Sequence, residues 1–254
     1  MIALAVAQAA LGIPSDRQFL GVIGRLLPGW FPALPGQSQF NRRLRRLTPQ
    51  LTTVQMMLAE LVAEGRVRLV DGTLIDCANY PGCAGRSAFA GQAAYGRCPS
   101  KGRFVWGMRL VLLCDPRGVP VGYDLVGPRT GEERECALRL AAAHAGTLLF
   151  ADGGFWGREY RSSMEAIDIE LVTPDRHRLG ERPPAEVAKA RIRLVIESVF
   201  STLKRQMRLE THLAETPGGL LQRIAQRLLA LTLGIYLNTM LGRPARALAA
   251  YDGR

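Results

Sequence analysis

The chain has 254 residues, 48% of them hydrophobic, which is enough to bury one sizeable core with a small helical addition. Its formal net charge of +11 comes from 33 lysines and arginines against 22 acidic residues, and such a surface favours a polyanion because phosphate neutralisation releases counterions. A gene of high GC content would also favour arginine, so charge alone names no function.

Cysteine spacing and hydropathy exclude further classes of protein. The five cysteines are an odd number with no CxxC pair, so we expect reduced thiols in a cytoplasmic protein, with a metal site at Cys77, Cys83 and Cys98 as the alternative. The uncharged first fifteen residues lack the basic start of a signal peptide. The apolar segment Leu228–Leu241 is shorter than the roughly 20 residues of a bilayer span. We therefore expect a soluble protein with no membrane partner.

Residues 1–65 are predicted to form three helices, which we interpret as an N-terminal helical DNA-binding region. The breaks fall at Gly12-Ile13-Pro14 and in the Pro- and Gly-rich run Pro28–Gly36. The last helix carries a cluster of basic side chains that could bind a phosphate backbone or simply form a solvated helical face: Arg42, Arg43, Arg45 and Arg46.

From residue 66 the pattern becomes that of an α/β domain. Val67, Leu69 and Asp71 alternate with Arg66, Arg68 and Val70 at the period of a strand, which places Asp71 on the inward, apolar face. A Gly-, Cys- and Ser-rich stretch over 79–102 is predicted to be an irregular loop. Two further strands, Phe104–Cys114 and Val119–Val126, are joined by a turn at residues 115–118 and form an antiparallel hairpin.

The second half of this domain alternates helices and strands. A helix after Gly131 is followed by Thr147–Ala151, a continuous apolar run typical of a strand buried on both faces. A short helix from about Trp156, a strand Ile169–Thr173, a basic loop over 174–184 and two helices after Ala185 complete the chain. This order predicts a ribonuclease-H-like mixed sheet flanked by helices over residues 66–254, with the small N-terminal helical region before it.

Two aspartates lie where a cleft in an open α/β sheet is expected to form. Asp71 is on the first strand, and Asp152 ends the Thr147–Ala151 strand before two glycines that allow a sharp turn and close ligand approach. Asp152 could instead cap the helix near Trp156. Asp76 competes with Asp71, but positions five apart on a strand face opposite sides, and Asp71 shares the inward face.

A third acid, Glu197, lies on an amphipathic helix. At about 100° per residue, Arg193, Glu197 and Lys204 fall within roughly 40° of one another beside the apolar stripe. The alternative is a solvated ion pair, because Arg193 and Glu197 have the spacing of an ordinary helical pair.

Together, three carboxylates on two strands and a helix can converge at one end of a sheet. Such acids repel one another unless cations neutralise them, and an all-oxygen site suits Mg²⁺ or Mn²⁺ better than zinc. Two such ions would support an in-line displacement at phosphorus. The combination of Asp71, Asp152 and Glu197 therefore favours metal-dependent phosphoryl transfer.

At these residues the sequence resembles the DDE transposases of bacterial insertion sequences, especially the group with a YREK signature around its glutamate. Arg193-x3-Glu197-x6-Lys204 matches the R, E and K of that signature with its spacing intact, although Ala190 stands at the tyrosine position. The segments 70–73 and 150–155 are similar to the first and second aspartate motifs, with Gly153 where a small basic residue is often found. Residues 98–101 and 31–35 also resemble one branch of the family, so the likeness covers nearly the whole chain.

The resemblance implies a transposase that cuts DNA at the ends of its element and joins the freed 3′-hydroxyl to target DNA. Asp71, Asp152 and Glu197 would bind Mg²⁺ or Mn²⁺, and a homodimer on DNA is expected. DNA would be bound by the four arginines of the cluster and by Arg193, Lys204, Lys101 and Arg103. The alternatives are a nuclease of the same fold and a non-catalytic DNA-binding relic.

Overall fold

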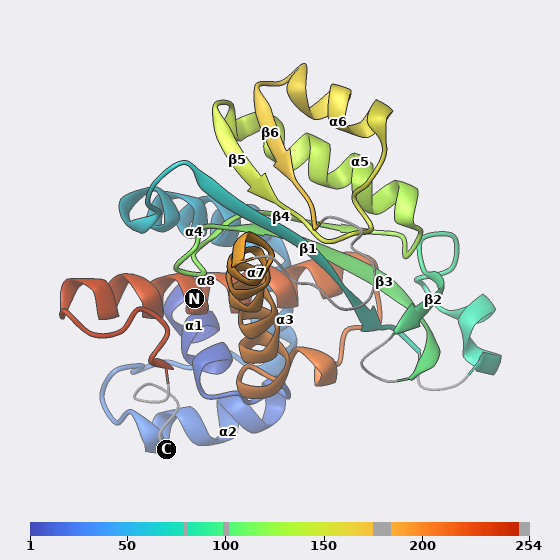
Figure 1. The fold of residues 1–254 in the computed structure, drawn as a ribbon. Coiled ribbons are helices and arrows are strands. Elements are labelled where there is room, and N and C mark those ends of the chain that lie inside the picture. Colours follow the sequence, from blue (N-terminus) through green and yellow to red (C-terminus); the bar gives the residue numbers. More distant parts are fainter. Residues whose placement is uncertain (79–80, 99–101, 175–183, 249–254) are drawn as a thin grey trace. The chain divides into compact units, whose positions relative to one another are not determined.

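The computed structural model describes residues 1–78, 81–98, 102–174 and 184–248, the side chains of 81–83 and 184–192 excepted. These residues form two compact units (Figure 1). The helical unit comprises Met1–Leu61 and Ser201–Arg254, and the sheet unit comprises Val62–Phe200. The division at residue 61 lies close to the boundary predicted near residue 65, whereas the last part of the chain belongs with the N-terminal helices.

The sheet unit is built on a six-stranded mixed sheet. The strands pair in the order β2-β3-β1-β5-β6, and β4 also pairs with β3. β1 is antiparallel to β3 and parallel to β5, which is parallel to β6. β2 and β4 pair with different parts of β3, residues 103–107 and 109–114. Along the second part the strand order is β4-β3-β1-β5-β6, which confirms the predicted ribonuclease-H-like fold. The strands are β1 Val67–Asp76, β2 Ala94–Cys98, β3 Arg103–Cys114, β4 Pro120–Val126, β5 Thr147–Phe150 and β6 Ile169–Val172.

β1 is longer and more deeply buried than its sequence pattern predicts. It continues to Asp76, so that Asp71 lies in its middle. The neighbours Leu69 and Val70 are 1% and 2% exposed. Because successive strand residues point to opposite faces, both faces of β1 are buried here, and the predicted division into one inward and one outward face is wrong.

The stretch 79–102 was predicted to be an irregular loop, but it contains β2. β2 pairs with β3 from Ala94↔Gly107 to Cys98↔Arg103. A Cβ on Gly96 would come within 2.9 Å of Pro128 Cβ, so the glycine that made this stretch look irregular permits close packing at that point.

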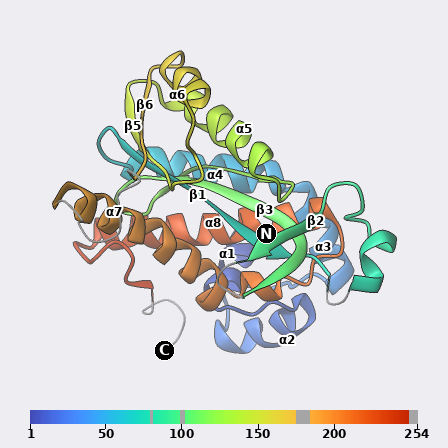
Figure 2. The same ribbon diagram turned by 45° about the vertical axis from the view of Figure 1, so that its right-hand side comes forward.

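The α-helices in the described part of the sheet unit are α5 Thr130–Ala141, α6 Arg158–Glu165 and α7 Pro184–Ser201. α5 packs against β3 and β4, and α6 packs against β6 and α5 (Figure 2). The inward side of α5 is made of small apolar residues, with Cys136, Ala137 and Ala141 all buried. The described helices and strands of this half agree with the predicted order.

The helical unit contains α1 Ile2–Ala10, α2 Asp16–Leu26, α3 Gln37–Arg46, α4 Thr48–Val62 and α8 Pro217–Met240. Four helices precede the sheet where three were predicted, because the third breaks at Leu47 into α3 and α4. Pro49 in the first turn of α4 explains the break, since proline lacks an N–H and disfavours helix in the residue before it.

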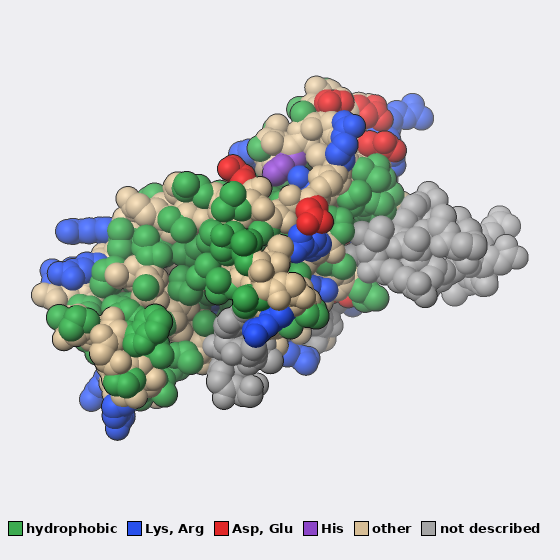
Figure 3. All heavy atoms as spheres, turned by 90° about the vertical axis from the view of Figure 1, so that its left-hand side faces the viewer, with side chains coloured by type: hydrophobic (Ala, Val, Ile, Leu, Met, Phe, Trp, Pro, Cys, Tyr) green, Lys and Arg blue, Asp and Glu red, His purple; other side chains and the backbone are tan. Residues whose placement is uncertain are grey.

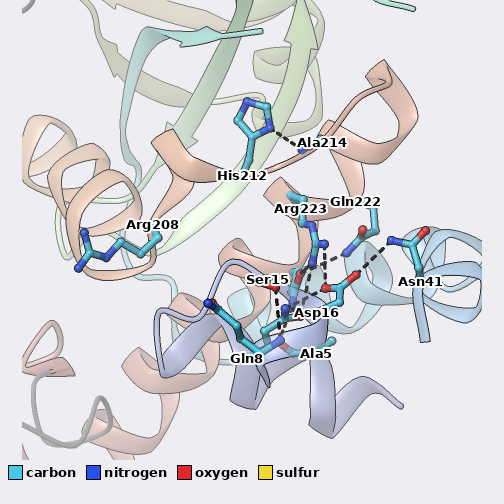
Figure 4. A network of polar contacts seen from close by, with 12 residues as sticks. Ala5, Gln8, Ser15, Asp16, Asn41, Arg208, His212, Ala214, Gln222 and Arg223 are labelled. Carbon is cyan, nitrogen blue, oxygen red and sulfur yellow. Dashed lines mark hydrogen bonds and ion pairs between the residues drawn. The ribbon is translucent and has the colours of Figure 1, made fainter. Parts of the chain in front are cut away.

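One buried carboxylate joins four helices of this unit (Figure 4). Asp16 accepts hydrogen bonds from Gln8 of α1 at 2.9 Å and from Asn41 of α3 at 3.1 Å. It also pairs with Arg223 of α8 at 2.8 Å. Residues 2–46 are therefore fixed to a helix more than 170 residues further along the chain.

No helix in the described part of the chain is both long and apolar enough to cross a membrane.

Candidate metal and DNA site

Asp71 is an acid in the middle of a buried strand. Burial, with a smaller contribution from the negative charges of Asp152 and Glu133, raises its pKa from 3.8 to about 7. The Gly72 N–H, which donates to Asp71 Oδ1 at 2.8 Å, and the charge of Arg193 act in the opposite direction. The pKa of this carboxyl group is therefore near neutral, and the group lies close to two other acids.

Asp152 lies beside Asp71 because of the strand register. In the parallel pair β1 and β5, Leu69 is opposite Phe150, and each aspartate follows two residues later. Asp152 Oδ1 accepts a hydrogen bond from the Gly154 N–H at 2.7 Å. The N-cap of α6 is Gly157, with no side-chain capping bond, so the alternative in which Asp152 caps this helix is wrong.

Glu197 lies on α7 with its side chain 53% exposed. Its Oε1 is 4.0 Å from Arg193 Nη2, which is the ordinary helical pair considered as the alternative. The positive charge of Arg193 nonetheless lowers the pKa of Asp71, so this turn of α7 lies near the aspartates. Within the described residues, no three His, Cys, Asp or Glu side chains are close enough to hold a metal ion. The structure thus brings Asp71 and Asp152 together, and the third ligand stays a prediction.

The two aspartates suit a hard divalent cation. Both are oxygen donors. Burial is the main cause of the raised pKa of Asp71, and the repulsion from Asp152 that adds to it is one that a cation would relieve. Among the described residues, Cys77, Cys98, Cys114 and Cys136 form no disulfide and join no such metal-binding group. The side chain of Cys83, part of the alternative cysteine site, lies outside the described residues.

The rival aspartate, Asp76, is engaged elsewhere. Its Oδ2 lies 3.6 Å from Arg103 Nη2, and its Oδ1 accepts a hydrogen bond from the Ala78 N–H. Arg103, predicted to bind DNA, is thus partly neutralised, although its side chain is 66% exposed.

The other predicted DNA contacts differ in their surroundings. On α3, Phe40 and Leu44 are buried, whereas all four arginines of the cluster at 42–46 are exposed. Lys204 lies in a π-helical turn, Thr202–Gln206, and is 3.8 Å from Glu210 Oε1. The predicted alignment with Glu197 assumed 3.6 residues per turn throughout, which a π-helical turn does not have. Lys101 lies outside the described residues. In Figure 3, Lys and Arg side chains are dispersed over the visible face rather than gathered in one patch.

Three charged residues near the aspartates were not predicted: Arg109, Glu133 and Arg134. Glu133 of α5 is held by Arg109 of β3, with Nη1 3.0 Å from each carboxylate oxygen. Burial raises the pKa of Glu133, and Arg109 lowers it. The available signal was helical spacing, because Glu133 precedes the buried positions 136, 137 and 141 of α5 by three, four and eight residues. An acid on the apolar face of a helix requires a partner.

Comparison with known proteins identifies the sheet unit and part of the helical unit with one family. A family model described as the transposase DDE domain matches residues 63–233. No curated protein matches the sequence. A chain in the crystal structure of a pre-cleavage Mos1 transpososome is 13% identical over 94% of this chain and 74% of that chain. Its TM-score is 0.28, too low for this likeness to bear on fold or function.

Proposed function

The chain belongs to the DDE transposase family. We propose that it cleaves DNA at the ends of a bacterial insertion sequence and joins the freed 3′-hydroxyl to target DNA. The observation that carries the proposal is the pair Asp71 and Asp152, placed by parallel neighbouring strands with Asp71 poised near neutral pH. The R, E and K spacing at residues 193, 197 and 204 supports assignment to the YREK group.

Asp71 and Asp152 would hold Mg²⁺ or Mn²⁺, with Glu197 as a third ligand. The bound cations would polarise the phosphate and activate the attacking oxygen. Two hydrogen bonds from glycine N–H groups orient the aspartates, one to each Oδ1. Arg193, whose charge already reaches Asp71, would contact the DNA phosphate next to the cut.

Little holds Glu197 in its present orientation. An exposed helical pair of the Arg193–Glu197 kind contributes about 0.3–0.5 kcal/mol, and a 4.0 Å separation is at the limit of an ion pair. DNA phosphate would compete for Arg193, because both are drawn to the same guanidinium, and would release the glutamate to reach a cation.

We propose that the protein also binds DNA away from the cleavage site. The arginines of α3 are exposed, so they could bind several phosphates of an element end. Lys204, Lys101 and Arg103 would each contact DNA phosphate as well. A homodimer would hold both ends of the element at once.

The test incubates the pure protein with DNA that ends in the inverted repeats flanking its gene. We expect cleavage and strand transfer in Mg²⁺ or Mn²⁺ and none in a chelator. Asp71→Asn, Asp152→Asn and Glu197→Gln should each lower the cleavage rate by about 100-fold or more, while Asp76→Asn, on the same strand, should retain it. Unchanged cleavage in the first three variants would remove the assignment.

The same assay separates the two rivals. A nuclease of this fold would release cut ends that never join target DNA. A DNA-binding relic would retain DNA in a gel shift but leave it intact in every metal.

A further inference from the structure

The first turn of α5 sends two adjacent side chains to the two aspartate segments. Glu133, the first of these, closes over the backbone of β1 beside Asp71. A methyl group at Gly72 would overlap Glu133 Oε1 and would lie 2.9 Å from Arg109 Cδ. Only a glycine therefore admits this packing. The N–H of the same Gly72 donates to Asp71 Oδ1 at 2.8 Å. Glu133 therefore packs against the residue whose N–H orients Asp71.

Arg134, the second, holds the turn after Asp152. Its Nε and Nη2 both donate to the carbonyl oxygen of Gly154, at 2.9 and 2.5 Å. The guanidinium also lies 5.9 Å from the Trp156 ring centroid and 5.7 Å from that of Tyr160. The N–H of the same residue, Gly154, donates to Asp152 Oδ1 at 2.7 Å. Arg134 therefore binds the carbonyl oxygen of the residue whose N–H orients Asp152.

We propose that Glu133 and Arg134 are positioning residues, which together set the separation and aim of Asp71 and Asp152 through Gly72 and Gly154. The proposal rests on the proposed function, in which these aspartates hold the cations. α5 is a single rigid element, so two neighbouring side chains in one turn fix two strands against each other more accurately than either strand's own loop does.

A ligand role for Glu133 itself fits the geometry less well. Arg109 Nη1 lies 3.0 Å from both of its carboxylate oxygens, and Arg109 Nη2 donates to the Pro128 carbonyl at 3.3 Å. The pair is buried, with side-chain exposures of 17% for Arg109 and 10% for Glu133. The Glu133 carboxylate is thus already paired with Arg109, and groups that orient metal ligands are commonly held by such hydrogen bonds.

The test compares two charge-matched double variants on the same helix. Glu133→Gln with Arg134→Gln removes both positioning side chains. The control, Glu135→Gln with Arg139→Gln, removes one acid and one base of the same helix, of which Arg139 pairs with Asp124 of β4 at 2.6 Å. Mn²⁺ affinity is measured from the free ion by electron paramagnetic resonance. DNA cleavage and thermal unfolding are measured on the same proteins.

We expect the Glu133→Gln, Arg134→Gln variant to bind Mn²⁺ about 10- to 100-fold more weakly than the native protein. It should need correspondingly more Mn²⁺ for cleavage, whereas the control variant should bind Mn²⁺ as the native protein does. Arg134→Lys, which can still donate to the Gly154 carbonyl, should recover part of this loss and serves if the double variant does not fold. Unchanged Mn²⁺ affinity, or a lower Tm with the affinity intact, would overturn the proposal. If Asp71→Asn binds Mn²⁺ as the native protein does, the proposed function itself is wrong, which is a different result.

Discussion

At the scale of residues, Asp71 makes the stability of the metal-free protein depend on pH. Because its folded pKa is raised to about 7 from 3.8, the native state keeps a proton that the unfolded chain has released between these values. The free energy of unfolding should therefore fall as pH rises from about 4 to 7, by at most about 4 kcal/mol at 1.36 kcal/mol per pKa unit.

Urea unfolding in a chelator at pH 5 and pH 8 measures this dependence. Asp71→Asn cannot ionise and should flatten it, whereas Asp76→Asn, on the same strand, should retain it. A native protein that is more stable at pH 8 than at pH 5 would show that Asp71 is not the buried acid described here.

Gly72 supports a prediction about packing. Gly72→Ala forces Glu133 away from β1 and should destabilise the fold by roughly 1–3 kcal/mol, the usual cost of overpacking. Gly122→Ala is the control, because its Cβ would be no closer than 3.6 Å to any neighbour. Equal midpoints of chemical denaturation for the two variants would contradict the contact between Glu133 and Gly72.

The aspartates could be predicted from sequence, and their supports could not. Asp71 and Asp152 stand at the ends of local patterns, in a strand alternation and after an apolar run before two glycines. Glu133 and Arg109 are 24 residues apart and meet only because α5 packs on β3. A contact made by tertiary packing leaves no local periodicity to read.

At the scale of elements, α3 is expected to contribute to DNA binding through charge. Arg42→Gln with Arg46→Gln removes two exposed cations one helical turn apart. If both contact phosphates, the slope of log affinity against log salt should fall by about 0.9 for each contact. Arg17→Gln with Arg25→Gln, which are exposed on α2, is the matched control. The same slope in both pairs of variants would place the DNA elsewhere.

Element boundaries show where sequence patterns are informative. β3, β4, β5, β6 and α5 were predicted closely, because each has a long apolar run or a clear turn beside it. β2 was missed because it lies in a stretch rich in glycine, cysteine and serine, which is typical of a loop, although pairing with β3 determines its conformation. The break between α3 and α4 was missed because Pro49 lies just after the arginine cluster rather than in an obvious turn.

At the scale of the whole molecule, the helical unit depends on a pair distant in sequence. Asp16 and Arg223 have side-chain exposures of 5% and 7% and lie 2.8 Å apart. Asp16→Ala should destabilise the protein by about 3–5 kcal/mol, because it leaves the Arg223 charge buried without its carboxylate.

Guanidinium unfolding compares this variant with Asp16→Leu combined with Arg223→Met. The double variant removes both charges and should recover much of the stability, as apolar replacement of a buried pair commonly does. If the double variant is no more stable than Asp16→Ala, the loss comes from Gln8 and Asn41 rather than from the ion pair. Sequence patterns could not predict this partnership between the two ends of the chain.

The most direct test of the central claim is a crystal structure with Mn²⁺ and DNA, in which anomalous scattering locates the ion. We predict an anomalous peak about 2.0–2.2 Å from carboxylate oxygens of both Asp71 and Asp152, with Glu197 turned from Arg193 toward it. A peak bound by other residues, or Asp71 and Asp152 without a shared ion at saturating Mn²⁺, would contradict the account.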